Sequence, residues 1–128
     1  MALVTFTSET GMFHSACRVT WARSTEWYGF QPAVHRRPVS DGKVDRTNRT
    51  PFINYSVTFE IADSLTRLAV TSTSAEYATK SYILGVCDCV SFTADIARAC
   101  RLGVPWLNLT PYGFIQVLAF WNSYVSKT

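Results

Sequence analysis

The chain has 128 residues, of which 48% are hydrophobic and 16% are charged, and its formal net charge is +3. This composition suits one globular domain over residues 1–128 and excludes a disordered chain. The charge is too small to predict nucleic-acid binding, and no stretch approaches the roughly 20 apolar residues that span a bilayer. We therefore expect neither a nucleic-acid partner nor stable insertion into a membrane.

The first part of the chain alternates between apolar and polar residues, as β-strands do. Strands are predicted over residues 2–7, 14–22, 25–30 and 53–62. Residues 33–51 are rich in Arg, Pro, Gly, Asp, Asn and Thr, and they predict a long surface loop whose basic residues, Arg49 among them, are solvated.

After residue 62 the apolar period changes to that of helices. Two short helices are expected first, one capped by Asp63 or Ser64 and one capped within residues 72–74. Strands that come first and helices that come last indicate an α+β fold, in which helices pack on a small antiparallel sheet.

Two longer helices follow, each with a clear start. Asp88 opens the strongest one, over residues 89–101. Thr110 is the expected N-cap of the last helix, which has Pro111 at its first position and runs to about residue 122.

The stretch SYILGVCDCVSFTADIARAC places Cys87 and Cys89 one residue apart at the start of the strongest helix. That spacing strains a disulfide between them, and a zinc site would need more ligands than two histidines supply, so no metal or other cofactor is expected. In the first helical turn, N–H groups and the helix dipole stabilise a thiolate and an oxyanion, which predicts a lowered pKa for Cys89. The neighbouring Asp88 opposes this effect. A buried structural cysteine is the alternative interpretation.

Three segments in this order, GMFHSACRVTW, EWYGFQP and CDCVSFTADIA, resemble the circularly permuted papain-like cysteine hydrolases, relatives of the NlpC-type peptidoglycan peptidases. The resemblance covers roughly residues 11–120. It implies a permuted papain-like fold in which the His strand precedes the Cys helix, with Cys89 as nucleophile and His14 as general base. A third, polar group often comes from the neighbouring strand, where Gln31 and His35 are the nearest candidates.

This chain departs from the family pattern at two places. Asp88 stands where Asn is more usual. Counting by twos also puts His14 on the strand face opposite Cys17 and Val19, unless His14 precedes the strand or lies on a bulge.

The resemblance implies an enzyme that cleaves amide bonds in the stem peptides of bacterial cell wall. An antibacterial effector of a secretion system fits it, made in the bacterial cytoplasm without a signal peptide, exported, and active in the periplasm of a target cell. A cognate immunity protein is then a candidate partner. The alternatives are a lipid thioesterase or acyltransferase, or a protein deamidase, on the same Cys–His dyad. A further alternative is a non-catalytic binding or immunity-type domain.

Overall fold

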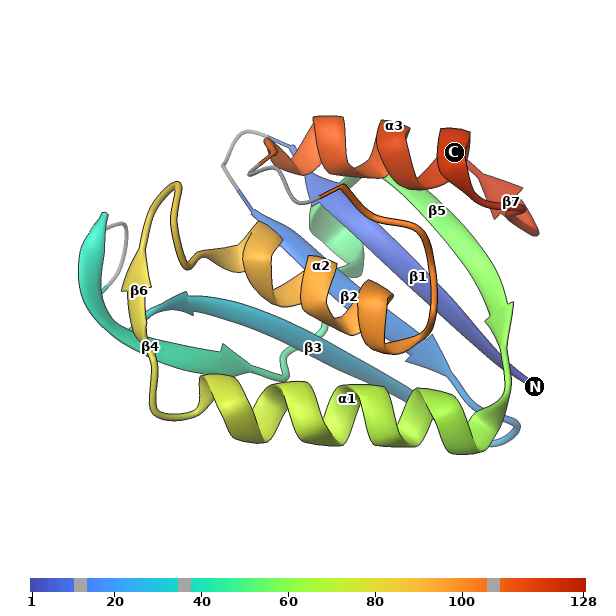
Figure 1. Ribbon diagram of the computed structural model, residues 1–128, viewed down its shortest axis with the longest axis horizontal. Coiled ribbons are helices and arrows are strands. Elements are labelled where there is room, and N and C mark those ends of the chain that lie inside the picture. Colours follow the sequence, from blue (N-terminus) through green and yellow to red (C-terminus); the bar gives the residue numbers. More distant parts are fainter. Residues whose placement is uncertain (11–13, 35–37, 106–108) are drawn as a thin grey trace.

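The computed structural model describes residues 1–10, 14–34, 38–105 and 109–128. Its centre is a seven-stranded sheet of antiparallel neighbours in the order β6-β4-β3-β2-β1-β5-β7 (Figure 1). The strands are β1 (Ala2–Glu9), β2 (Ser15–Thr20), β3 (Thr25–Pro32), β4 (Val39–Asp45), β5 (Ile53–Ile61), β6 (Ser81–Ile83) and β7 (Ser126–Lys127).

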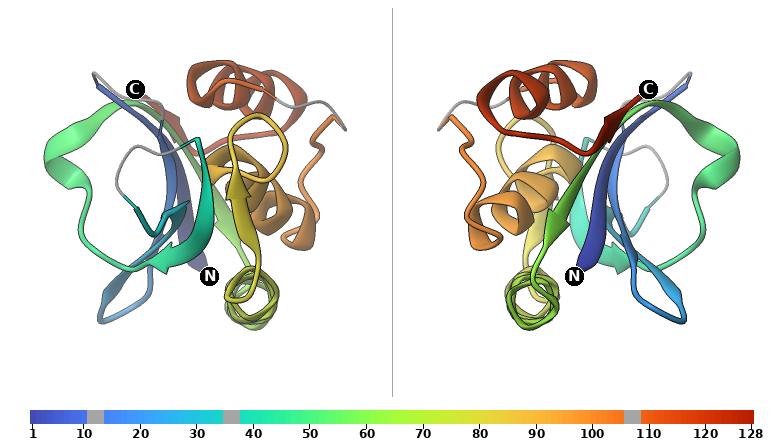
Figure 2. Two further views of the ribbon diagram at one scale, coloured as in Figure 1. Left: turned by 90° about the vertical axis from the view of Figure 1, so that its left-hand side faces the viewer. Right: turned by 90° about the vertical axis from the view of Figure 1, so that its right-hand side faces the viewer.

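Three helices cover one face of this sheet, whereas the segment between β4 and β5 crosses the other face (Figure 2). The helices are α1 (Asp63–Tyr77), α2 (Cys89–Ala99) and α3 (Pro111–Trp121), and the crossing segment contains the short 3-10 helix η1 (Thr50–Phe52). The expected α+β architecture is therefore confirmed. None of the helices in the described part of the chain is long and apolar enough to cross a bilayer.

Alternate residues of the central strands build the core beneath the helices. Phe6 of β1 meets Phe114 of α3 edge to face, with ring centroids 5.9 Å apart. Phe30 of β3 stacks on Phe92 of α2 at 6.1 Å and meets Tyr77 of α1 at 5.0 Å. Each buried aromatic side chain of this kind contributes about 1.5–3 kcal/mol, so these ring pairs fix the three helices on the sheet.

The expectation of a long loop over residues 33–51 is wrong, because β4 lies within this range and η1 begins there. Gly42 makes β4 compatible with the sheet. A Cβ atom there would lie 2.1 Å from Cζ of Phe30 and 2.6 Å from the carbonyl oxygen of Lys80. The strand thus approaches its neighbours at a point where only glycine fits.

The two short helices expected after residue 62 are one continuous helix, α1. The Ser72 hydroxyl, which could cap a new helix, instead donates a hydrogen bond to the Leu68 carbonyl one turn earlier, at 2.7 Å. The first residue of α1 is Asp63, and its N-cap is Ala62, which offers no capping side chain. The strongest helix also ends earlier than expected, at Ala99.

Candidate functional site

The amino terminus of α2 is built around Asp88, which is fully buried. Its Oδ1 accepts hydrogen bonds from the N–H groups of Val90 (3.0 Å) and Ser91 (3.1 Å), and the Ser91 hydroxyl accepts the N–H of Asp88 at 3.2 Å. This reciprocal capping box confirms Asp88 as the residue that opens the helix. The carboxylate also accepts the N–H groups of Val90 and Ser91. The expectation that free N–H groups of the helix can bind an oxyanion is therefore wrong for these two residues.

Cys89 is fully buried in the first turn of α2. Its sulfur accepts hydrogen bonds from the backbone N–H of Ser15 and from the hydroxyl of Tyr82. Burial, with a smaller contribution from the charge of Asp88, nevertheless raises the pKa of the thiol to about 12. The predicted lowering of this pKa is therefore wrong: loss of water around the sulfur outweighs the helix dipole. At neutral pH the thiol carries its proton.

Tyr82 of β6 lies directly at this helix start. Its buried hydroxyl donates to the Cys89 sulfur and accepts the Cys89 backbone N–H. Burial raises the pKa of the phenol, and the neighbouring Cys89 and Asp88 add to the rise. Sequence reasoning missed this residue, since a lone Tyr in a three-residue strand carries no recognisable pattern. The hydroxyl and the Cys89 N–H together form a pair of polar groups beside the sulfur.

His14 lies just before β2, and its imidazole is on the sheet face without helices. Nε2 is 3.5 Å from the place that a Cβ atom on Gly29 would take. Gly29 alternates with Phe30, which packs under α2, so Gly29 and the imidazole occupy the other face. The next residue, Ser15, points toward the helices and contacts Thr93 Oγ1 through its hydroxyl at 3.1 Å.

The structure therefore does not bring His14 and Cys89 together. Their side chains lie on opposite faces of the sheet, as counting by twos along the strand indicates. His14 does precede the strand proper, which begins at Ser15, but this position alone does not turn the imidazole toward α2. The Cys–His dyad that the resemblance implies is not assembled in this conformation.

A buried charged cluster surrounds His14 on its own face. The Glu9 side chain is fully buried and accepts two hydrogen bonds from Arg49, from Nε at 2.9 Å and from Nη2 at 2.6 Å. Its Oε2 lies 3.5 Å from His14 Nε2, which has no hydrogen-bond partner among the described residues. Burial lowers the pKa of His14; the charge of Arg49 lowers it too, while Glu9 and Asp45 oppose the shift.

Arg49 was expected on a solvated loop, and this expectation is wrong. Its side chain is only 18% exposed, because η1 and the residues before it hold the guanidinium over the sheet. Glu9 was not recognised as a site residue either. Its partner Arg49 is 40 positions away in the sequence, so no local sequence pattern predicts this ion pair.

The two candidates for a third catalytic group have different outcomes. Gln31 belongs to β3. In the antiparallel pairing of β2 with β3, Ala16 lies across from Gly29. Two residues further along, the same register places His14 across from Gln31. Gln31 and His14 therefore share the sheet face that Cys89 does not. His35 lies outside the described residues.

No group of three or more His, Cys, Asp or Glu side chains within the described ranges is arranged to hold a metal ion. Comparisons with protein families, with curated proteins and with solved structures gave no match. The chemistry of this chain therefore has to be inferred from its own residues.

Proposed function

We propose that the protein is a cysteine hydrolase that cleaves amide bonds in peptidoglycan stem peptides and acts as a secreted antibacterial effector. The resemblance to permuted papain-like hydrolases supports this proposal. One structural observation carries it: the Cys89 sulfur receives the N–H of Ser15, the residue that follows His14. The backbone thus brings the thiol and the one histidine of the described residues to the same end of β2.

The reactive arrangement requires the His14 imidazole on the face of α2. Side chains of successive strand residues point to opposite faces, so a one-residue change in the alternation at His14 and Ser15 moves the imidazole to Cys89. The pairing of β1 with β5 is already irregular between Ser8 and Glu9, at the same end of the sheet. A bulge-type adjustment is the ordinary way in which strands re-aim a side chain near an active site.

In that arrangement His14 takes the proton from Cys89, and the thiolate attacks the carbonyl carbon of the substrate amide. The Tyr82 hydroxyl, which now donates to the sulfur, and the Cys89 N–H, which that hydroxyl now accepts, give up these partners and donate to the oxygen that becomes negative. The imidazolium then protonates the leaving amine, which departs and leaves a thioester on Cys89. Water, deprotonated by His14, hydrolyses the thioester; the carboxylic acid leaves, and the thiol regains its proton.

The test is digestion of purified sacculi, with the released fragments analysed by mass spectrometry for new amines and carboxylates in the stem peptides. We expect Cys89→Ala and His14→Ala each to lower the rate by at least ~10³-fold, because the two residues act as a unit. Cys87→Ser is the matched control and should retain most activity. Loss of activity in Cys87→Ser but not in Cys89→Ala would contradict the proposal.

A cellular experiment separates the substrate classes. Directed to the periplasm, the wild-type protein should cause rounding and lysis, and Cys89→Ala should not. Kept in the cytoplasm, the wild type should be tolerated, because cross-linked wall peptides are absent there. Toxicity in the cytoplasm together with intact sacculi would contradict the cell-wall substrate. It would indicate that the same Cys–His dyad acts on a protein or a lipid.

The second candidate function is a non-catalytic binding domain, and the complete burial of the protonated Cys89 thiol favours it. Alkylation with iodoacetamide, followed by peptide mapping, distinguishes the two. A structural cysteine in this environment reacts more slowly than free cysteine, and half-buried Cys87 reacts first. Cys89 alkylation faster than that of free cysteine requires the reactive arrangement.

A further inference from the structure

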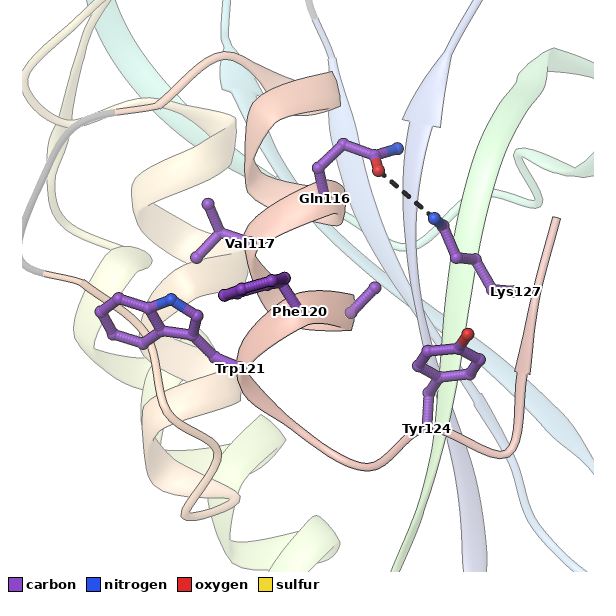
Figure 3. A pocket seen from close by; sticks show the side chains of 7 residues that line it. Gln116, Val117, Phe120, Trp121, Tyr124 and Lys127 are labelled. Atoms are coloured by element: carbon purple, nitrogen blue, oxygen red, sulfur yellow. Dashed lines mark hydrogen bonds between the residues drawn. The ribbon is translucent and has the colours of Figure 1, made fainter.

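Aromatic side chains are exposed where α3 ends and in the segment that follows it (Figure 3). Phe120 is 87% exposed, Trp121 54% and Tyr124 48%. With Val117 and Lys127 they line an open hollow of about 480 Å³ between the helix and the end of the chain. Large exposed aromatic groups gathered at one place usually mark an interaction surface. We call these five residues the aromatic surface.

The charge of this region is one-sided. From Leu109 to Thr128 the side chains carry a single charge, that of Lys127. Its ammonium donates to the amide oxygen of Gln116 at 3.3 Å, at the rim of the hollow (Figure 3). No side-chain carboxylate lies among the described residues that line the hollow, and the whole chain has a formal charge of +3. An anionic partner therefore meets no acidic side chain there.

We propose that the aromatic surface docks on an anionic lipid bilayer without crossing it. Trp and Tyr favour the headgroup level of membranes, because each has an apolar ring and a polar group that remains hydrated. The almost fully exposed ring of Phe120 enters the outer part of the acyl layer. Lys127 meets the lipid phosphates. The arrangement joins an apolar contact to an electrostatic one, which peripheral binding requires.

This docking does not depend on the proposed hydrolase activity. The aromatic surface belongs to α3 and the chain end, whereas Cys89 begins α2. The Cys89→Ala protein should therefore bind lipid as the wild type does. Binding is measured directly, so its failure and the failure of the hydrolase proposal are separate results.

The experiment is co-sedimentation with vesicles of phosphatidylcholine, alone or with one quarter phosphatidylglycerol. We expect binding to the mixed vesicles that weakens with salt, and weaker binding to the neutral ones. The double variant Phe120→Ser, Trp121→Ser should lower the partition coefficient by about tenfold or more. Lys127→Gln should remove only the difference between the two lipids. Leu68→Ser, at a 66% exposed position on α1, is the matched control and should change nothing.

Three results overturn the proposal: wild-type protein that stays in the supernatant at millimolar lipid, an equal loss of binding in Leu68→Ser, or unchanged binding in the double variant. Light scattering without lipid tests whether a second copy of the chain binds to the aromatic surface instead. If the wild type self-associates and the double variant does not, the aromatic surface is a protein interface instead. The exposed positions keep the fold intact, which a thermal melt of each variant checks.

Discussion

At the start of β2, the two faces of the sheet place neighbouring residues in different chemical environments. On the helix-covered face, Ser15 contacts the Cys89 thiol and Thr93 in a buried environment, where the charge of Asp88 acts on the thiol. On the opposite face, His14 lies against the ion pair of Glu9 and Arg49. Neighbouring residues of one chain thus belong to two sites, separated by the thickness of the sheet.

This difference shows why sequence proximity is a poor guide to catalytic pairing in a strand. A shift of one residue exchanges the faces of all side chains in a strand. Which residue faces α2, Ser15 or His14, therefore decides between an isolated buried thiol and a catalytic dyad. Each prediction below changes one face and leaves the other as a reference.

The largest effect is expected from breaking the ion pair on the helix-free face. Arg49→Ala leaves the fully buried carboxylate of Glu9 without its bidentate partner. We expect the free energy of unfolding to fall by about 3–5 kcal/mol in urea titrations, as for other broken buried pairs.

The matched control is Arg46→Ala. Arg46 is half exposed: it lies 3.7 Å from the accessible Glu26, donates to the Trp27 carbonyl at 2.6 Å and lies over the Tyr28 ring at 4.0 Å. Because none of these contacts pairs a buried charge, its loss should cost about 1–2 kcal/mol. Equal losses in the two variants would show that the Glu9 carboxylate stays solvated, and the contrast between the two faces would disappear.

A smaller effect is expected at the amino terminus of α2. Asp88→Asn retains a capping oxygen but removes the charge that raises the pKa of Cys89. In a Cys87→Ser background, alkylation of Cys89 at pH 8.5 should accelerate about threefold or more, because more thiolate is present. Asp95→Asn, which contacts Tyr77 and Arg98 instead, is the control. A rate that does not change would mean that burial alone sets the thiol pKa.

The smallest effect concerns the pH dependence of stability. The pKa of His14 is lowered in the folded state, mainly by burial, so the unfolded chain binds more protons between that pKa and about 6.5. Stability should therefore fall as the pH drops from 7.5 to 5.5. His14→Gln should flatten the profile in urea titrations at each pH. A profile that keeps its slope would assign the loss to other groups.

Local signals in the sequence predicted the regular elements well. Asp88 and Thr110 cap their helices as expected, and Pro111 occupies the first position of α3. The strands β1, β2, β3 and β5 were predicted because apolar and polar residues alternate along each of them. β6 and β7 have only three and two residues, which is too short for any alternation to show.

The candidate site was predicted less well, because its properties depend on residues distant in the chain. The pKa of the Cys89 thiol depends on how deeply α2 packs on β2. The helix dipole, which the sequence indicates, is only the local contribution to that pKa. The ion pair of Glu9 and Arg49 joins β1 to the segment before β5. The face of His14, by contrast, was available from counting along the strand, and it agrees with the structure.

The place of β1 between β2 and β5 sets an order for folding. β1 to β4 form a meander of successive neighbours, whose contacts are local. β5 pairs with the other edge of β1, where Ala2 meets Ile61 and Val4 meets Phe59, and this requires closure of a long loop with its entropic cost. The meander should therefore acquire protection from amide hydrogen exchange before β5 does. A refolding chain passes through a state in which the outer edge of β1 is an open template, and at high concentration that edge is where another chain would add.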